Sequence, residues 1–244
     1  MADFQTRTFG ASAGLAIDAG LRAYMNKVYG LMSVGTLLTA AVSWAVGTSP
    51  ALVGLMINPQ TGGMNLLGWV AFLLPLAMAF GFGAVINRFS APAAQLFFYA
   101  YAAAIGVQLS FIFLAYTGAS IATTFLSTAV GFAGLSLYGY TTKRDLSAFG
   151  AFLNVGVWGI LGALLINMFL QSPAIDFAVS VIGVLVFAGL TAWDTQAIKV
   201  NYLQNARAGN EEWLHKSAIM GALQLYMDFI NMFLFLLRFM GDRR

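Results

Sequence analysis

The sequence predicts an all-α integral membrane protein with seven transmembrane helices. Of its 244 residues, 60% are hydrophobic and only 9% are charged, whereas roughly a quarter of the residues of an average soluble protein are charged. The mean hydropathy is +0.80. A soluble chain of this length would need far more polar surface to cover one core. The few charges are separated by long uncharged segments, and these segments define the individual helices.

Two uncharged segments predict the first four spans. A helix that crosses a bilayer core of about 30 Å needs roughly 20 apolar residues. No charged residue occurs within 28–87 or within 89–142, and each segment is long enough for two spans. Turn-forming clusters within 48–63 and a short junction at 116–120 divide them. The four spans are expected at about 26–47, 66–87, 92–115 and 119–140.

Three further spans follow the charged sequence at 143–145. A Gln-Ser-Pro sequence at 171–173 ends the fifth span, and a polar stretch at 201–216 separates the sixth from the seventh. These spans are expected at about 148–170, 176–199 and 217–239. The chain then consists of a short cytoplasmic N-terminal tail (1–25), one seven-helix domain (26–239) and a C-terminal tail (240–244). Glycines inside the spans are expected to allow close helix contact, namely Gly81, Gly83, Gly156, Gly159 and Gly162.

The distribution of lysine and arginine predicts the orientation. Segments on one side of the predicted membrane hold nine basic residues, and the loops at 48–65, 116–118 and 171–175 on the other side hold none. Because basic loops stay inside, the N-terminus is expected in the cytoplasm. Seven crossings would place Arg238, Arg243 and Arg244 outside, against this rule. An alternative topology, in which the last segment is a re-entrant hairpin, would return the C-terminus to the cytoplasm.

Two aspartates inside the last two apolar segments are the main candidates for a functional site. Asp194 lies in the sixth expected span and Asp228 in the seventh. A carboxylate in hydrocarbon costs on the order of a few kcal/mol, so such residues are rarely kept without a partner or a function. The alternative is a structural acid that only hydrogen-bonds a neighbouring helix. Gln224 and Asn231 share a helix face with Asp228, which predicts that this face of the last helix is buried.

The sequences around these aspartates resemble the signature of the Bax inhibitor-1 family, the transmembrane Bax-inhibitor-motif (TMBIM) proteins. They read AGLTAWDTQAIK at 188–199 and LYMDFINMFLFLLRF at 225–239. The spacing of the two blocks, the seven spans and the short N-terminus are similar to those of the bacterial members. The resemblance implies a fold in which the last helix is central between two three-helix layers. It also implies a multi-pass protein of the bacterial inner membrane.

The resemblance implies a function as well. It indicates ion transport by a pH-sensitive calcium leak channel, in which an aspartate pair on the last two helices is the pH sensor and lies on the ion pathway. In this sequence the pair is Asp194 and Asp228. The alternative that the family offers is a membrane interaction protein that modulates a membrane-bound ATP-dependent protease. The expected partners are the lipid bilayer and, for the alternative, a membrane protease complex.

Pairing of the two aspartates sets a condition on the helices that carry them. Asp194 lies five residues before Lys199, which places it about 7.5 Å below the inner interface at about 1.5 Å per residue. Asp228 lies twelve residues after Lys216, which places it about 18 Å below that interface by the same rise. The depths agree only if the last helix begins before Lys216, near Glu211, or if the helices tilt differently. Two carboxylates in a low dielectric cannot both ionise cheaply, so such a pair titrates as a unit.

A calcium ion at this pair is expected to bind weakly. Ca²⁺ takes roughly six to eight oxygens, and two aspartates supply at most four. Asn231, Thr195, backbone carbonyls or water would have to complete the shell. Because protons and cations compete for the same oxygens, this site predicts a pH-dependent leak.

Arg88 is a candidate gate partner. It is the single charge between Lys27 and Lys143, at the inner end of the second span. It either pairs with Asp194 and locks the inner mouth, or it is an orientation anchor that reaches the interface. The lock predicts that Arg88→Ala raises calcium flux at neutral pH, and the anchor predicts that flux is unchanged.

Other classes of function lack the residues they need. The sequence has no cysteine and one histidine, His215, which excludes cysteine nucleophiles and leaves too few ligands for a metalloenzyme. The last span has no lysine for a retinal Schiff base, and no Gly-x-Ser-x-Gly sequence indicates a serine protease. We therefore expect that the protein is not an enzyme and has no cofactor, and that Ca²⁺ is a permeant ion. The basic residues are scattered, so nucleic acid is not an expected partner.

Overall fold

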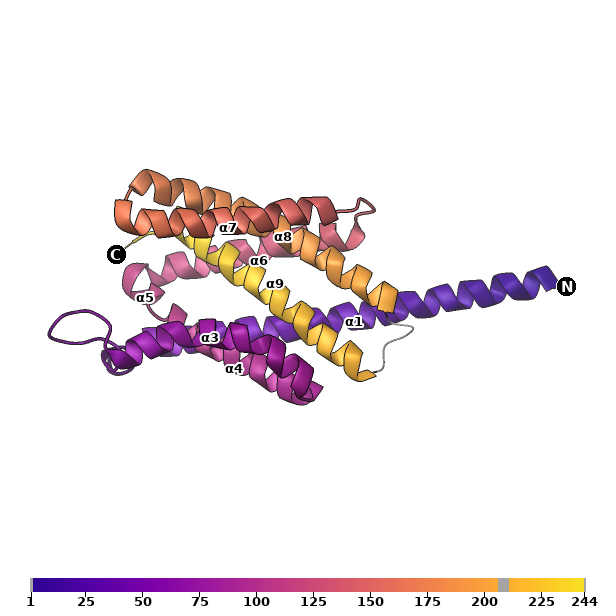
Figure 1. Ribbon diagram of the computed structural model, residues 1–244, viewed down its shortest axis with the longest axis horizontal. Coiled ribbons are helices and arrows are strands. Elements are labelled where there is room, and N and C mark those ends of the chain that lie inside the picture. Colours follow the sequence, from indigo (N-terminus) through magenta and orange to yellow (C-terminus); the bar gives the residue numbers. More distant parts are fainter. Residues whose placement is uncertain (1, 206–210, 244) are drawn as a thin grey trace.

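The computed structural model describes residues 2–205 and 211–243, with side chains described from residue 19 onward. Every regular element in this part of the chain is a helix. Figure 1 shows an elongated bundle from which the N-terminal part of one helix projects. The helices are α1 (Ala2–Gly47), α2 (Pro50–Gly54), α3 (Leu66–Arg88), α4 (Ala91–Leu109), α5 (Ile112–Ala115), α6 (Gly118–Thr141), α7 (Ser147–Leu170), α8 (Pro173–Asn205) and α9 (Glu211–Met240).

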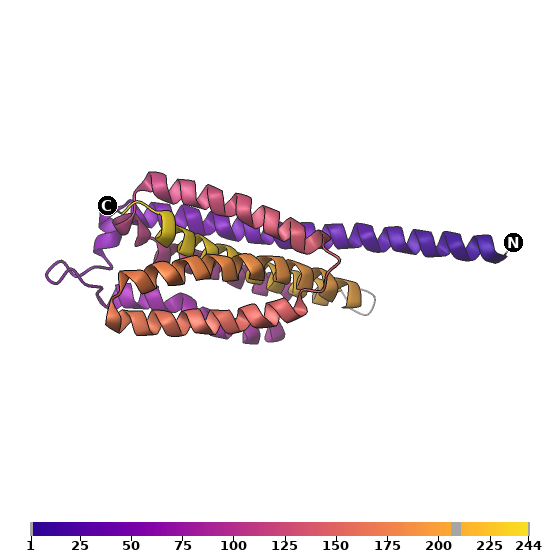
Figure 2. The same ribbon diagram turned by 90° about the horizontal axis from the view of Figure 1, so that it is seen from above.

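Seven segments of the described residues are long and apolar enough to cross a membrane, which confirms the predicted fold class and number of spans. The third span joins α4 and the short α5, and each of the others is a single helix. In the first span, Leu21, Tyr24 and Met25 already lie buried in the core, ahead of the predicted start near residue 26. Residues 2–18 continue α1 beyond the bundle without a break (Figure 2).

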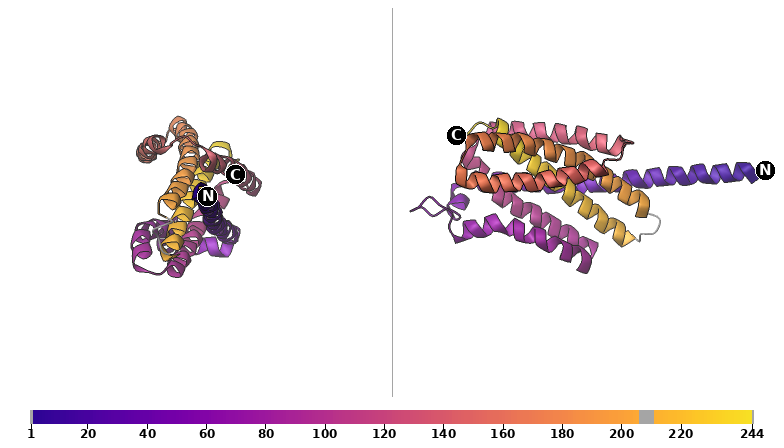
Figure 3. Two further views of the ribbon diagram at one scale, coloured as in Figure 1. Left: turned by 90° about the vertical axis from the view of Figure 1, so that its right-hand side faces the viewer. Right: turned by 45° about the horizontal axis from the view of Figure 1, so that its top comes forward.

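The helices form two groups that α9 joins. In the first group α4 packs against α1 and α3, and in the second α8 packs against α6 and α7. α9 contacts α1 and α4 on one side and α6 and α8 on the other, and it crosses the bundle obliquely (Figures 1 and 3). In α9, 61% of an 18-residue stretch is buried, against 39% or less in the other six spans. The full enclosure of the last helix by two three-helix layers stays a prediction.

The last span is one uninterrupted helix from Glu211 to Met240, so the alternative of a re-entrant hairpin is wrong. The polar residues halfway along it do not break the helix. Nδ2 of Asn231 donates to the backbone carbonyl of Met227 at 2.9 Å, and this local bond satisfies the amide within the helix.

The residues after α9 are held at the α5–α6 end of the bundle. The backbone N–H of Asp242 donates to Oγ of Ser120 at 2.9 Å, and its carbonyl accepts from the N–H of Thr117 at 3.1 Å. The C-terminus therefore lies at the opposite end of the bundle from the loop between α6 and α7 (Figure 1).

Two polar side chains of α8 hold the loop between α6 and α7. Oε1 of Gln196 accepts from the N–H of Leu146 at 2.8 Å, and its Nε2 donates to the carbonyl of Arg144 at 2.7 Å. Nζ of Lys199 donates to the carbonyl of Tyr140 at 2.7 Å and lies 5.3 Å from the centre of the Tyr140 ring. These bonds, together with the packing of α6 and α7 on α8, make the three helices one unit.

Close helix contacts use other glycines than those predicted. A Cβ at Gly81, Gly83, Gly159 or Gly162 would meet no described atom within 4 Å, and of the five only Gly156 faces a neighbour, Val186. The tight contacts are instead Gly139 on Ala192, Gly150 on Trp193 and Gly183 on Phe235. The prediction was wrong for four of the five residues because hydropathy does not reveal which face of an apolar helix is packed.

Replacement of Gly139 by alanine is expected to destabilise the protein, because the added Cβ would overlap the backbone carbonyl of Ala192 in α8. Overpacking costs about 1–3 kcal/mol, which exceeds the gain of about 1 kcal/mol that alanine brings over glycine in a helix. Gly162→Ala is the matched control and should leave stability unchanged or raise it. Thermal unfolding in detergent compares the two variants. Equal midpoints would show that α6 and α8 are not in close contact at this position.

Candidate functional site: a buried carboxyl pair

The structure brings Asp194 of α8 and Asp228 of α9 together. Their carboxyl groups hydrogen-bond to each other, and only 8% of Asp194 and 4% of Asp228 is exposed. α9 begins at Glu211, before Lys216, and crosses the bundle at an angle (Figure 1). The early start and the tilt together account for the depth at which the two side chains meet.

Both aspartates lie on the packed faces of their helices. Residues three and four apart share one face of a helix. On α8 the buried residues around the site are Leu190, Asp194 and Ile198. On α9 they are Leu225, Asp228 and Met232. The apolar neighbours that fill this interface therefore direct the two carboxyl groups toward each other and away from lipid.

The hydrogen bond between the carboxyl groups requires a proton on one of them, because an ionised carboxylate only accepts. The pair therefore carries at most one negative charge in this arrangement. Oδ2 of Asp228 is buried and has no hydrogen-bond partner among the described residues. The ion pairs in this part of the chain join other residues. Among the described residues, no cationic side chain forms an ion pair with either aspartate.

Arg88 lies apart from the pair. It is the last residue of α3, its side chain is exposed, and no ion pair joins it to Asp194. α3 packs on α4 in the first group of helices, whereas Asp194 belongs to α8 in the second. The contact that the lock interpretation requires is therefore not made in this arrangement. The exposed position at a helix end agrees with an anchor.

A polar cavity of about 420 Å³ lies near the pair, at the end of the bundle where α9 begins. Its lining includes Ile198, one helical turn from Asp194, and Gln224, one turn from Asp228. Further polar residues in the lining are Asn87, Asn201, Lys216 and Ser217. We call this cavity the vestibule. Gln224 was predicted to lie on a buried face, but its side chain is exposed in the vestibule.

The vestibule was not predicted from the sequence. Its lining comes from α1, α3, α8 and α9, and no spacing within one segment reveals such a combination. The nearest signal is Asn87, which precedes the candidate Arg88 and lines the cavity.

The two accessory residues make bonds elsewhere. Oγ1 of Thr195 donates to the carbonyl of Thr191 at 2.8 Å and lies 2.9 Å from Oγ of Ser136, which lies 2.7 Å from the hydroxyl of Tyr29. Because each hydroxyl has one proton, Ser136 donates to Thr195 and Tyr29 donates to Ser136. This chain joins α1, α6 and α8. Asn231 is bonded to its own helix, so neither residue is bonded to the aspartates.

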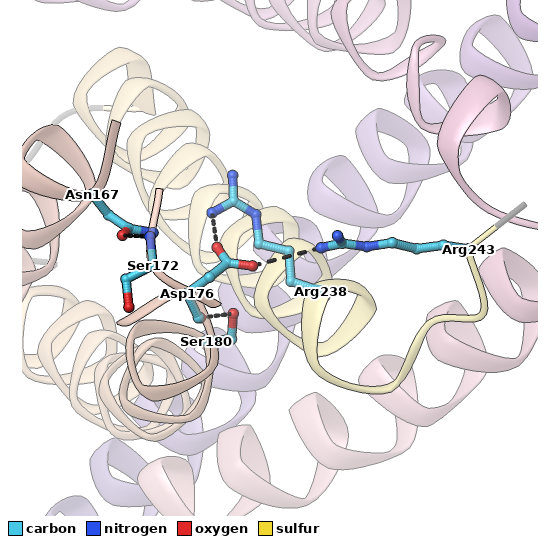
Figure 4. Close-up of polar contacts among 6 residues, drawn as sticks. All are labelled: Asn167, Ser172, Asp176, Ser180, Arg238 and Arg243. Carbon is cyan, nitrogen blue, oxygen red and sulfur yellow. Dashed lines mark hydrogen bonds and ion pairs between the residues drawn. The ribbon is translucent and has the colours of Figure 1, made fainter. Parts of the chain in front are cut away.

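A second acidic residue explains the arginines that depart from the orientation rule. Asp176 in the first turn of α8 lies 3.9 Å from Arg238 and 3.5 Å from Arg243 (Figure 4). Arg238 therefore contacts Asp176 and not Asp228. These side chains are more than a third exposed, so the pairs contribute little to stability. They nevertheless reduce the positive charge at the C-terminal end of the bundle.

These features define a class of protein, an all-α integral membrane protein with a hydrogen-bonded carboxyl pair buried between its last two spans. The model of the family described as inhibitor of apoptosis-promoting Bax1 matches residues 21–244. The chain belongs to this family, the Bax inhibitor-1 family, as the two blocks around the aspartates predicted.

Bacterial relatives are similar over nearly the whole chain. The inner membrane protein YbhL of Escherichia coli K12 is 47% identical over 226 residues, which cover 93% of this chain and 94% of YbhL. The uncharacterized protein RP147 of Rickettsia prowazekii is 42% identical over 244 residues, the full length of both chains. An uncharacterized protein of Caulobacter vibrioides is 40% identical over 235 residues, 95% of this chain and 93% of its own.

Proposed function

We propose that the protein is a pH-sensitive calcium leak channel of a bacterial inner membrane, in which Asp194 and Asp228 sense pH and form part of the ion pathway. The observation that supports this most directly is the hydrogen bond between the two carboxyl groups inside the bundle. Ionisable groups at such a depth are costly and commonly mark ion or proton pathways. The similarity to YbhL, an inner membrane protein, supports the location.

The shared proton accounts for the pH sensitivity. Its loss would place two negative charges in contact in a low dielectric, where their repulsion is strong. A cation can then replace the proton and offset both charges. A pair that shares a proton holds α8 and α9 together, whereas a fully ionised pair binds a cation or separates.

The donor set favours weak binding of Ca²⁺. The pair offers four oxygens of the roughly six to eight that Ca²⁺ takes. Within residues 19–205 and 211–243, no three His, Cys, Asp or Glu side chains gather into a metal-binding group. Water and backbone carbonyls would complete the shell, and a site of this kind releases its ion readily, as a leak requires.

The surroundings of the pair suggest a closed state. The vestibule brings water to within about one helical turn of both carboxyl groups. Beyond Asp228, the packed face of α9 continues with buried apolar side chains, namely Met232, Phe233, Phe235 and Leu237. An ion that leaves the pair in this direction can pass only if these side chains separate from α6 and α8.

Calcium flux into liposomes tests the proposal. Purified protein is reconstituted around a calcium dye, and Asp194→Asn and Asp228→Asn are compared with the wild type across neutral pH. Each variant is expected to lose most of the pH response, because the one remaining carboxyl group no longer shares a proton with a second one. Asp145→Asn is the matched control, since hydrogen bonds from the side chain and backbone of Ser147 lower the pKa of the Asp145 carboxyl. Asp145 thus stays ionised throughout, and its variant should behave as the wild type.

The same assay separates the alternatives. Arg88→Ala is expected to keep wild-type flux, because Arg88 does not contact Asp194; increased flux at neutral pH would support the lock. Flux that equals that of protein-free liposomes at every pH would contradict the channel. That result would favour the alternative of an interaction protein that modulates a membrane-bound ATP-dependent protease.

A further inference from the structure

A groove runs along α1 beside α6. Two adjoining cavities of about 1010 and 660 Å³ lie between these helices, and both are lined by Thr36 and Phe125. Phe229 of α9 lies at the base of the larger cavity. We call the larger cavity the α1–α6 groove. Its volume is at the upper end of the range of about 300–1,000 Å³ that is typical of small-molecule pockets.

The length of the α1–α6 groove matches one leaflet of a bilayer. Its lining on α1 extends from Arg22 to Leu37, which corresponds to about 22 Å at about 1.5 Å per residue. Half of a bilayer, with its headgroup region, is about 20–22 Å thick. A molecule that fills the groove would therefore extend from the headgroup level to the middle of the membrane.

The two ends of the groove differ in polarity. Arg22 and Asn26 at one end are exposed, and no ion pair joins Arg22 to another side chain within residues 19–205 and 211–243. Deeper in the groove the hydroxyl groups of Thr36, Tyr29 and Ser136 already make hydrogen bonds within the protein, whereas Ser33 in the lining is exposed. Thr36 donates to the carbonyl of Met32 at 2.9 Å, and Tyr29 and Ser136 bond to each other.

The surface that remains deeper in the groove is therefore mainly apolar. It is formed by methionine, leucine and phenylalanine side chains, namely Met32, Leu37, Phe125, Phe132 and Leu137. An acyl chain can lie against such a surface without leaving a polar group unsatisfied.

The polar end of the groove is basic. Nζ of Lys199 lies over the ring of Tyr140, which lines the groove. Lys143 and Arg144 follow in the adjoining loop. Among the described residues of this loop, Asp145 supplies one negative charge against the two positive charges of Lys143 and Arg144. Glu212 of α9 is already paired with Lys216 at 3.0 Å. The described side chains at the mouth of the groove thus carry a net positive charge.

We propose that the α1–α6 groove binds one phospholipid with an anionic headgroup. Its phosphate lies at Arg22 and Asn26, and one acyl chain lies along the apolar wall formed by α1 and α6. Basic pockets between transmembrane helices are suited to anionic headgroups. A phospholipid has the same polarity as the groove, with one charged end and one apolar end, over the length of one leaflet. A second helix would be apolar along its whole length and would leave Arg22 without a partner.

Native mass spectrometry of the purified chain tests this site. The protein is titrated with phosphatidylglycerol or with phosphatidylcholine of the same acyl chains. The wild type is expected to retain one lipid and to prefer phosphatidylglycerol. Arg22→Gln should weaken phosphatidylglycerol binding on the order of tenfold, as loss of one charge-assisted hydrogen bond implies. It should weaken phosphatidylcholine binding less, because the choline cation already offsets the charge of the phosphate that Arg22 contacts. Arg88→Gln, at an exposed basic residue at the end of α3, which does not line the groove, is the control and should keep the wild-type preference.

Blocking the groove tests the position of the acyl chain. Ala133→Trp fills the groove from α6 and should abolish retention of both lipids, and Ser33→Trp fills it from α1 and provides a second variant should the first not fold. Ala151→Trp adds the same side chain at an exposed position of α7 and should retain the lipid. Lipid retention by both groove variants would overturn the proposal, as would an unchanged headgroup preference in Arg22→Gln. If the wild type is a dimer and Ala133→Trp dissociates it, the lipid proposal is also overturned. The groove would then bind a second copy of the chain.

Discussion

The apparent affinity for Ca²⁺ is expected to fall about tenfold for each unit that the pH is lowered, if binding of one ion displaces one proton from the carboxyl pair. The sign follows from competition: the proton that joins Asp194 to Asp228 occupies the oxygens that the cation needs. Acid therefore favours the ion-free pair, and alkali favours the ion-bound pair. The calcium concentration that gives half-maximal flux into liposomes, measured at several pH values, gives the slope.

The double variant Asp194→Asn/Asp228→Asn should show no such slope, because its amides keep a hydrogen bond between α8 and α9 but bind no proton in this range. A wild-type slope near zero would mean that the ion does not bind at the pair, even if flux is present. A slope of about a hundredfold per unit would mean that two protons leave for each ion. The pair would then be fully protonated in the closed state.

Thr195→Val is expected to destabilise the protein by about 1–3 kcal/mol, the cost of a buried polar group left without its partner. Thr195 is completely buried, and valine has nearly its shape but lacks the hydroxyl that accepts from Ser136. Ser136 would then have to donate to Tyr29 instead, and the proton of Tyr29 would lose the acceptor that it has now. Unfolding in detergent, by heat or by added denaturant, measures the loss.

Thr195→Ser is the matched control for this change, since it keeps the hydroxyl, and it should recover most of the stability. Tyr29→Phe tests the far end of the same chain of bonds. If the three hydroxyls act together, Thr195→Val and Tyr29→Phe will be non-additive in the double variant. Strict additivity, or a stable Thr195→Val, would show that the chain of hydroxyls does not hold α1, α6 and α8 together.

The spans were predictable because a bilayer imposes a length of about 20 apolar residues, and the positions of the charges mark where each span ends. The two blocks of sequence around Asp194 and Asp228 were also sufficient to identify the family. The start of the first span was harder to predict from the sequence. Burial of Leu21 and Tyr24 extends it, but these residues stand between charges that suggest an interface.

Contacts between distant segments could not be predicted in the same way. The position of Arg88 relative to Asp194 depends on which group of helices α3 joins, and hydropathy carries no information on this point. The bond between Tyr29 and Ser136 joins residues 107 positions apart, and it left no local pattern around Thr195. Arg238 and Asp176 likewise meet only because the ends of α8 and α9 lie together.

The bonds from Gln196 and Lys199 to the loop between α6 and α7 have a mechanical consequence. α8 cannot leave α9 alone, because Tyr140, Arg144 and Leu146 would have to follow it. Any displacement of α8 that parts the carboxyl pair is therefore expected to move the α6–α7 loop, and with it α6 and α7, in the same direction.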